Sequence, residues 1–214
     1  MKIVIIFLLS LSYLACAQDK RFMFVFLNSK PDKAELSKDE LDKLMKGHLA
    51  NIERLAAEGK LIVAGPFDEG GGIFIFNSSS ATEVNTWLST DPGIQAHRWN
   101  IEILPYTARV GSPCAIHKPY EMVTYEFIRF IMDTTKTNRR PASETARVHD
   151  NYLKKIIRVG HVIAEGNFNE GGGILIIEGD VPKKMIEADP ALKDGRYHVE
   201  FKKLWVAKGA FCEK

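Results

Sequence analysis

The chain carries almost no net charge for its length. Its 29 Lys and Arg residues are nearly balanced by 27 Asp and Glu residues, which leaves a formal charge of +2 over 214 residues. A protein that holds nucleic acid through phosphate contacts needs a basic patch or stripe, and the order of the charged residues provides none. The sequence therefore predicts no nucleic-acid partner, and its composition is that of an ordinary soluble globular protein.

The sequence also lacks the motifs of several enzyme classes. No serine lies in a nucleophile elbow, and no cysteine recurs at an equivalent place along the chain. No set of His, Cys, Asp and Glu has the spacing of metal ligands, so neither a metal site nor a cofactor is expected. The glycine-rich stretches join two expected strands instead of opening a helix, which excludes a phosphate-binding loop.

No apolar run is long enough to cross a bilayer as a helix. The run from Ile3 to Leu14 would extend roughly 18 Å, against a bilayer core of about 30 Å. Lys2 before it and Ala15-Cys16-Ala17 after it are typical of a secretory signal peptide. We expect cleavage after Ala17, export to a bacterial periplasm or out of the cell, and no transmembrane segment in the mature chain. The alternative is a lipoprotein anchored at Cys16.

Cysteine is scarce, with three residues in all. Without Cys16, the remaining pair is Cys114 and Cys212. In an oxidising compartment these two could form a disulfide that closes the second half of the chain. The sequence leaves this open because it does not give their separation in space.

A long repeat organises the chain. The stretch G-P-F-D-E-G-G-G-I-F-I-F begins at Gly65, and G-N-F-N-E-G-G-G-I-L-I-I begins 101 positions later, at Gly166. A period near 100 residues is the size of a small domain. We therefore expect a signal peptide at 1–17, one domain at 18–106, a linker at 107–120 and a second domain at 121–214.

The two halves have the same expected order of elements. In the first half, strands are expected at 22–27, 60–67, 72–77 and 98–106, and helices at 39–58 and from Ser80 to Leu88, each helix opened by an S-x-x-E capping box. In the second half, strands are expected at 122–132, 161–168, 173–178 and 196–207, and helices at 143–159 and 182–188. The order β-α-β-β-α-β predicts an α+β protein of two ferredoxin-like units.

Several expected strands are apolar on both faces, at 22–27, 73–76 and 174–177. An antiparallel sheet covered by helices on one side would show polar residues on the other side. A second surface must therefore cover these strands. We expect the two sheets to pack against each other as an α+β barrel within one chain. The alternative is that partner chains cover the sheets, and a homo-oligomer is compatible with both arrangements.

Two histidines recur at the same place in the repeat. His48 and His149 each lie on the apolar stripe of the long helix of their half. Such a residue is either a hydrogen-bonded core residue or a functional base, because histidine is the side chain that exchanges protons most readily near neutral pH.

The aspartates are the candidate partners of these histidines. Asp91 and Asp189 each precede a proline after the second helix of their half, and both helices of such a unit lie on one face of the sheet. The alternative interpretation is plain helix-stop chemistry. Asp133 is another candidate partner, although its counterpart in the first half is expected to be Asn28, which cannot act in the same way.

Taken together, these motifs resemble one family. The helix with His48, the stretch E-G-K-L-I-V-A-G-P-F, the run G-G-G-I-F-I-F and the later D-P pair resemble the YCII-related domain over 22–106, and more loosely over 122–207. The resemblance implies a dimeric α+β barrel, built here within one chain. It also implies a His–Asp site, which falls on His48 with Asp91 and on His149 with Asp189. The second copy departs from this pattern, because Glu165 brings a carboxylate near the second site.

Two hypotheses of function follow. The first is a small-molecule enzyme of the isomerase, lyase or dehalogenase type, in which His48 and His149 transfer protons and Asp91 and Asp189 hold the imidazoles. The second is a non-catalytic small-ligand-binding or interaction module of the cell envelope that uses the same pocket. The glycine-rich hairpins are expected to fix the register of the sheets and to touch no ligand.

Overall fold

The protein is described by a computed structural model that covers residues 22–136, 140–169, 171–180 and 182–212. The expected signal peptide, with Cys16, lies outside these described residues. Within the described ranges, no helix is both long enough and apolar enough to cross a membrane.

Each half of the chain follows the expected order, with one short helix added before its last strand. The first half contains β1 (Phe22–Ser29), α1 (Lys38–Ala57), β2 (Leu61–Pro66), β3 (Gly72–Phe76), α2 (Ala81–Leu88), α3 (Pro92–Gln95) and β4 (Trp99–Val110). The second half contains β6 (Met122–Met132), α4 (Ala142–Val159), β7 (Val162–Phe168), β8 (Gly173–Ile177), α5 (Lys183–Glu187), α6 (Pro190–Lys193) and β9 (Tyr197–Ala207). A small ribbon of β5 (Ser112–Pro113) and β10 (Phe211–Cys212) lies outside the main sheet.

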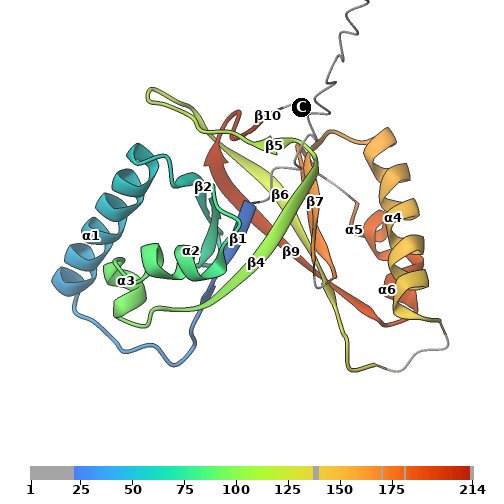
Figure 1. Cartoon of the computed structure of the whole chain (residues 1–214), viewed down its shortest axis with the longest axis horizontal. Helices are drawn as coiled ribbons and strands as arrows, with labels where there is room; N and C mark the ends of the chain where they lie inside the picture. The colour runs from blue at the N-terminus through green and yellow to red at the C-terminus, as the bar shows by residue number, and fades with distance from the viewer. Residues whose placement is uncertain (1–21, 137–139, 170, 181, 213–214) are drawn as a thin grey trace, which may run out of the picture.

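The strands form one antiparallel sheet of eight that closes on itself. Their order is β2-β3-β1-β4-β7-β8-β6-β9, and the two outer strands meet at a bridge between Phe67 and Leu204. The strands of the two halves lie in the middle of the molecule, and the helices of each half cover its outer sides (Figure 1). The predicted α+β barrel within one chain is confirmed.

The apolar strands are covered on both faces. In β1, Phe22, Phe24 and Phe26 point into the barrel, where they pack with side chains of the second half. The alternating Met23, Val25 and Leu27 pack instead beneath the helices of the first half. Burial of each such side chain stabilises the fold by roughly 1.5–3 kcal/mol. The surface that was expected to cover the sheet is therefore the sheet of the other half.

The two capping boxes expected from the sequence are present in part. At α1, Ser37 and Glu40 form the full capping box, with each side chain bonded to the other's backbone N–H. At α2, Ser80 accepts the N–H of Glu83 at 3.3 Å, but the Glu83 carboxylate accepts the Ser78 hydroxyl at 2.6 Å. The second expected capping box is thus only half formed, because a nearby serine competes for its carboxylate.

The strand that ends the first half is longer than expected. β4 continues to Val110 and pairs with β7 from Tyr106, opposite Phe168, to Val110, opposite Glu165. Residues 107–110, which were expected in a linker, are therefore part of the barrel. Their strand partner belongs to the other half of the chain, so no local pattern indicates it.

A disulfide closes the second half. Cys114 and Cys212 are bonded, with their Cα atoms 5.9 Å apart, a usual separation for such a bridge. The bridge joins the β5–β10 ribbon across 98 residues of sequence.

Candidate functional site

The first candidate site is a buried pair of His48 and Asp91. Nδ1 of His48 lies 2.8 Å from Oδ2 and 3.0 Å from Oδ1 of Asp91. Asp91 is completely buried, and His48 is 6% exposed. The two predicted site residues are therefore brought together from α1 and from the start of α3.

Asp91 has a second task in the fold. Its Oδ1 accepts the backbone N–H groups of Gly93 at 2.9 Å and Ile94 at 3.2 Å, which makes it the N-cap of α3. Aspartate is a favoured N-cap, and proline is favoured at the first helical position that follows. The Asp-Pro pair was interpreted as a possible helix stop, but in the structure it begins a new helix and also holds the histidine.

The surroundings keep Asp91 in its charged form. Burial alone would raise its pKa, but the hydrogen bond and the charge of His48, the amide of Asn51 at 3.1 Å and the Ile94 N–H together hold the pKa below its ordinary value. A carboxylate at Nδ1 favours the tautomer that carries its proton there, which leaves Nε2 as the acceptor in the neutral ring. Among the described residues, no hydrogen bond to Nε2 is found.

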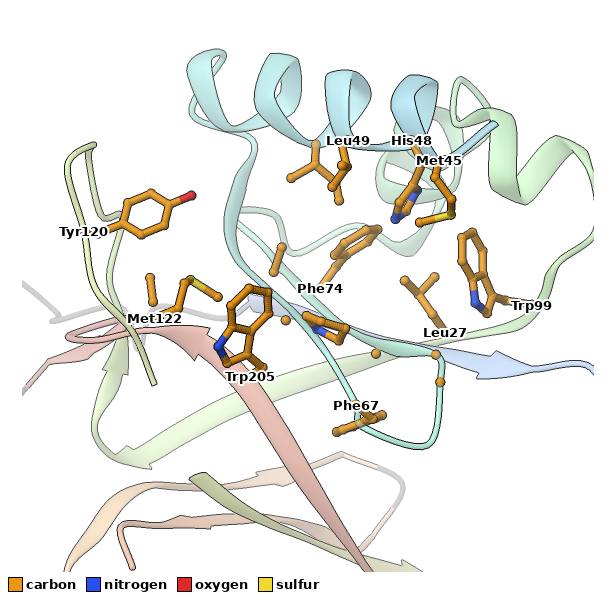
Figure 2. A pocket seen from close by; sticks show the side chains of 18 residues that line it. Leu27, Met45, His48, Leu49, Phe67, Phe74, Trp99, Tyr120, Met122 and Trp205 are labelled. Atoms are coloured by element: carbon orange, nitrogen blue, oxygen red, sulfur yellow. The ribbon is translucent and has the colours of Figure 1, made fainter. Parts of the chain in front are cut away.

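His48 lies in the wall of an apolar cavity of about 530 Å³, within the usual size range of small-molecule sites. Met45, His48 and Leu49 point from α1 toward Phe74 and Trp99 (Figure 2). The ring of Trp99 lies 4.9 Å from the imidazole ring, between centroids, and holds its orientation. Among the described residues, those that line the cavity include no Asp, Glu, Lys or Arg.

Part of this cavity was missed by the sequence interpretation. Tyr120, Met122, Trp205 and Ala207 line it from the second half of the chain, and they carry no motif that points to a site in the first half. The glycine-rich hairpins were expected to touch no ligand, yet the backbone of residues 70–72 also lines this cavity, and residues 171–173 line the space beside His149 in the same way. The first hairpin lies there because Gly71 adopts φ +76° and passes so close to the Leu27 carbonyl that a Cβ would lie 2.1 Å from the oxygen.

The second candidate site has the same central pair. Nδ1 of His149 lies 2.5 Å from Oδ2 of Asp189, and Oδ1 of Asp189 accepts the Ala191 N–H at 2.9 Å as the N-cap of α6. Both side chains are buried. Tyr197 stacks on the imidazole at 4.7 Å, and burial raises the pKa of this tyrosine to about 12.

A charged cluster fills much of the space beside His149. Arg109 donates from Nε to both carboxylate oxygens of Glu165 at 3.0 and 3.1 Å and from Nη2 to the same group, while its Nη1 donates to Asp150 at 2.8 Å. Burial works against the charge of Arg109, but the hydrogen bonds and charges of Glu165 and Asp150 outweigh burial and raise its pKa. The cavity that remains is about 210 Å³. Glu165 was expected near this site, whereas Arg109 was assigned to the linker.

The third candidate aspartate, Asp133, is not the hydrogen-bond partner of His149 Nδ1, which binds Asp189. Leu27 pairs with Gly72 and Phe130 with Gly173, so Leu27 and Phe130 are equivalent, and the counterpart of Asp133 is Lys30 rather than Asn28. Asp133 accepts hydrogen bonds from the backbone and hydroxyl of Thr135 at 2.9 and 2.6 Å. The carboxylate beside His149 is therefore that of Asp189, and Asp133 belongs to a turn.

No metal cluster is evident in the part of the chain that the structure describes: nowhere there do three or more His, Cys, Asp or Glu side chains gather as a metal site would require.

Comparison with known proteins places the first half in a family. The YCII-related domain matches residues 23–106. No curated protein matches the chain. Among solved structures, a "putative monooxygenase" from Lactobacillus acidophilus NCFM shares 12% identity at a TM-score of 0.46, over 91% of this chain and 98% of that chain. A heme-binding protein from Thermus thermophilus shares 14% identity at a TM-score of 0.42, over 90% and 91%. Residues 23–106 of the chain are a YCII-related domain.

Proposed function

We propose that the first site transfers a proton on a small, largely apolar molecule, with His48 as the group that moves the proton. One observation carries the proposal: a histidine oriented by a completely buried carboxylate lies in the wall of an apolar cavity of about 530 Å³. A base that is held in place and shielded from water can contribute a factor of about 10²–10⁴ to a reaction rate.

The chemistry begins with the neutral imidazole. Nε2 of His48 accepts a proton from an acidic C–H or O–H bond of the ligand, and the electron pair of that bond stays on the ligand. The resulting imidazolium is stabilised by the negative charge of Asp91 at Nδ1. Return of the proton to a different atom is an isomerisation. Loss of a leaving group from the carbanion is a lyase or dehalogenase reaction.

A direct test follows deuterium exchange. A panel of apolar ketones with acidic α C–H bonds, led by 2-tetralone, is incubated with the protein in D2O, and the loss of the α-proton signal is followed by ¹H NMR. The wild type should accelerate the exchange, and His48→Gln should lower the rate by at least about 100-fold. Displacement of the neutral dye N-phenyl-1-naphthylamine should show that the variant still binds the ketone. Exchange by His48→Gln at the wild-type rate would remove His48 from the mechanism.

The alternative is a ligand-binding module without catalysis. It is favoured by the scarcity of proton-carrying groups, because among the described side chains that line the cavity only His48 and Tyr120 can titrate. A wild type that binds the ketones but leaves their α-protons unexchanged would support this alternative.

We further propose that the protein works outside the cytoplasm. The N-terminal sequence pattern supports export, and the bond between Cys114 and Cys212 suits an oxidising compartment. Cell fractionation of the full chain, beside a chain that lacks residues 1–17, tests this; recovery of both in the cytoplasm would contradict it.

A further inference from the structure

The two junctions between the halves of the barrel differ. At one junction, β4 and β7 pair at four positions, from Tyr106 opposite Phe168 onward. At the equivalent junction, the described residues show one isolated bridge, between Phe67, just past the end of β2, and Leu204 of β9, and one further backbone hydrogen bond, from the Asp68 N–H to the Lys203 carbonyl at 3.2 Å. The residue beside that bridge in β2 is Pro66, which has no N–H to donate to a ladder, whereas β7 has Asn167 at this place. The β2–β9 junction is therefore the less tightly paired one.

The apolar cavity reaches this junction. Ala64, Gly65 and Pro66 of β2 line it on one side, and Trp205 and Ala207 of β9 line it on the other. Figure 2 shows Trp205, Met122 and Tyr120 at the end of the cavity away from Trp99. A molecule that places a polar group at His48 would thus have further apolar space along the junction.

Exposed apolar side chains gather at the same place. Six large hydrophobic side chains of the described residues are exposed, and four of them line this cavity: Met45, Leu49, Tyr120 and Trp205. Leu49 is 56% exposed and Trp205 is 52% exposed. Apolar side chains left in water around a cavity mark a binding groove, because their burial by a ligand is favourable.

From these features we infer that the first site takes an uncharged molecule with an extended apolar portion, and that this portion lies along the β2–β9 junction against Trp205. The inference deepens the proposed function, since it names the class of molecule that the same site would act on. In the part of the chain that the structure describes, no Asp, Glu, Lys or Arg lines the cavity, so a charge on this portion of the molecule would be left unpaired in an apolar place.

The second half shows what would block such a molecule. Counting from the equivalent pairs Tyr106–Phe168 and Leu204–Phe67, Arg109 stands where the first site has Ala207, and Glu165 stands where it has Ala64. The double variant Ala64→Glu/Ala207→Arg therefore places at the first site the two residue types that pair in the second half, where Arg109 lies at a shift in the β4–β7 register and also binds Asp150.

The test uses unbranched primary alcohols from hexanol to decanol, which displace N-phenyl-1-naphthylamine from the full-length protein. Each added methylene should tighten binding to the wild type by roughly fourfold while the chain fits the cavity. In Ala64→Glu/Ala207→Arg, this dependence on chain length should disappear. A wild-type affinity that does not change with chain length would overturn the inference.

A milder variant guards against misfolding of the double variant. The position in β4 that is equivalent to Trp205 is occupied by Thr107. The variant Trp205→Thr therefore puts threonine at this exposed position of β9, and it should weaken decanol binding by about tenfold. Val159→Thr is the matched control, because Val159 is 78% exposed and lies outside the cavity. Equal affinities of these two variants would also overturn the inference. These assays require no turnover, so they succeed or fail independently of proton exchange by His48.

Discussion

The two His–Asp pairs have nearly the same geometry in very different surroundings. In both halves, a buried aspartate caps a short helix and binds Nδ1 of a histidine on the long helix. Beside His48 lies an apolar cavity, whereas beside His149 the Arg109–Glu165–Asp150 cluster leaves less than half of that space. The pair thus has a structural role in both halves, since it fastens two helices together. Whether the pair also has a chemical role depends on the size of the cavity beside the histidine.

The largest expected effect separates the two histidines. If only the first site has room for a substrate, His48→Gln should lower the rate of ketone proton exchange by at least about 100-fold. His149→Gln removes the same group from the crowded site and should leave the rate within about threefold of the wild type. Exchange rates measured by NMR at equal protein concentration compare the two. Equal losses in both variants would show that the two sites work alike.

The contribution of the charged cluster to stability can be measured by removing one of its members. Arg109→Ala leaves Glu165, which is 1% exposed, as a buried charge without its main partner, and should lower the free energy of unfolding by about 3–5 kcal/mol. The double variant Arg109→Ala/Glu165→Ala removes both charges and should be clearly more stable than Arg109→Ala alone. Urea unfolding monitored by circular dichroism measures both. An Arg109→Ala protein as stable as the wild type would mean that water reaches Glu165 freely.

The disulfide offers a third contrast, because it encloses the second half alone. Cys114→Ser/Cys212→Ser opens a loop of 98 residues and should lower the free energy of unfolding by about 2–4 kcal/mol. Amide hydrogen exchange should accelerate first in β5 and β10, while β1 and β3 remain protected. Uniform acceleration across both halves would show that the bridge stabilises the barrel as one unit.

The smallest expected effect concerns pH. The pKa of Asp91 is lowered in the folded protein, so its contribution to stability is present above the unfolded-state pKa of about 3.9 and is lost as the pH falls through the lower folded value. Asp91→Asn keeps a side chain that can cap α3 but removes the charge. The wild type should exceed this variant by about 1–2 kcal/mol at pH 5 and by less at pH 3. A gap that widens toward acid would contradict this sign.

Most of the fold could be predicted from the sequence, because its signals are local. The repeat from Gly65 and Gly166, the capping box at Ser37 and the strands that are apolar on both faces all led to the barrel that the structure shows. The histidines and their aspartates could be located as well, since they recur in both halves.

The rest of the site could not be predicted, because it depends on contacts between the halves. Trp205 and Tyr120 line a cavity whose histidine lies more than 70 positions earlier in the chain. Arg109 lies in a stretch with the sequence of a linker, and only the pairing of β4 with β7 brings it to the second site. The double use of Asp91 was also hidden, because an Asp-Pro pair alone does not show whether it ends one helix or begins the next.

Holding both halves of the barrel in one chain has a consequence for how the sites can change. In a barrel built from two identical chains, every substitution occurs in both sites. A substitution that enlarges one cavity also enlarges the other, and a substitution that stabilises the fold at one site stabilises it at both. Here Ala64 and Glu165 occupy equivalent places but are separate residues of one sequence. Each site could therefore be altered on its own, and the molecule could keep one of them open to small molecules while the other served to hold the barrel together.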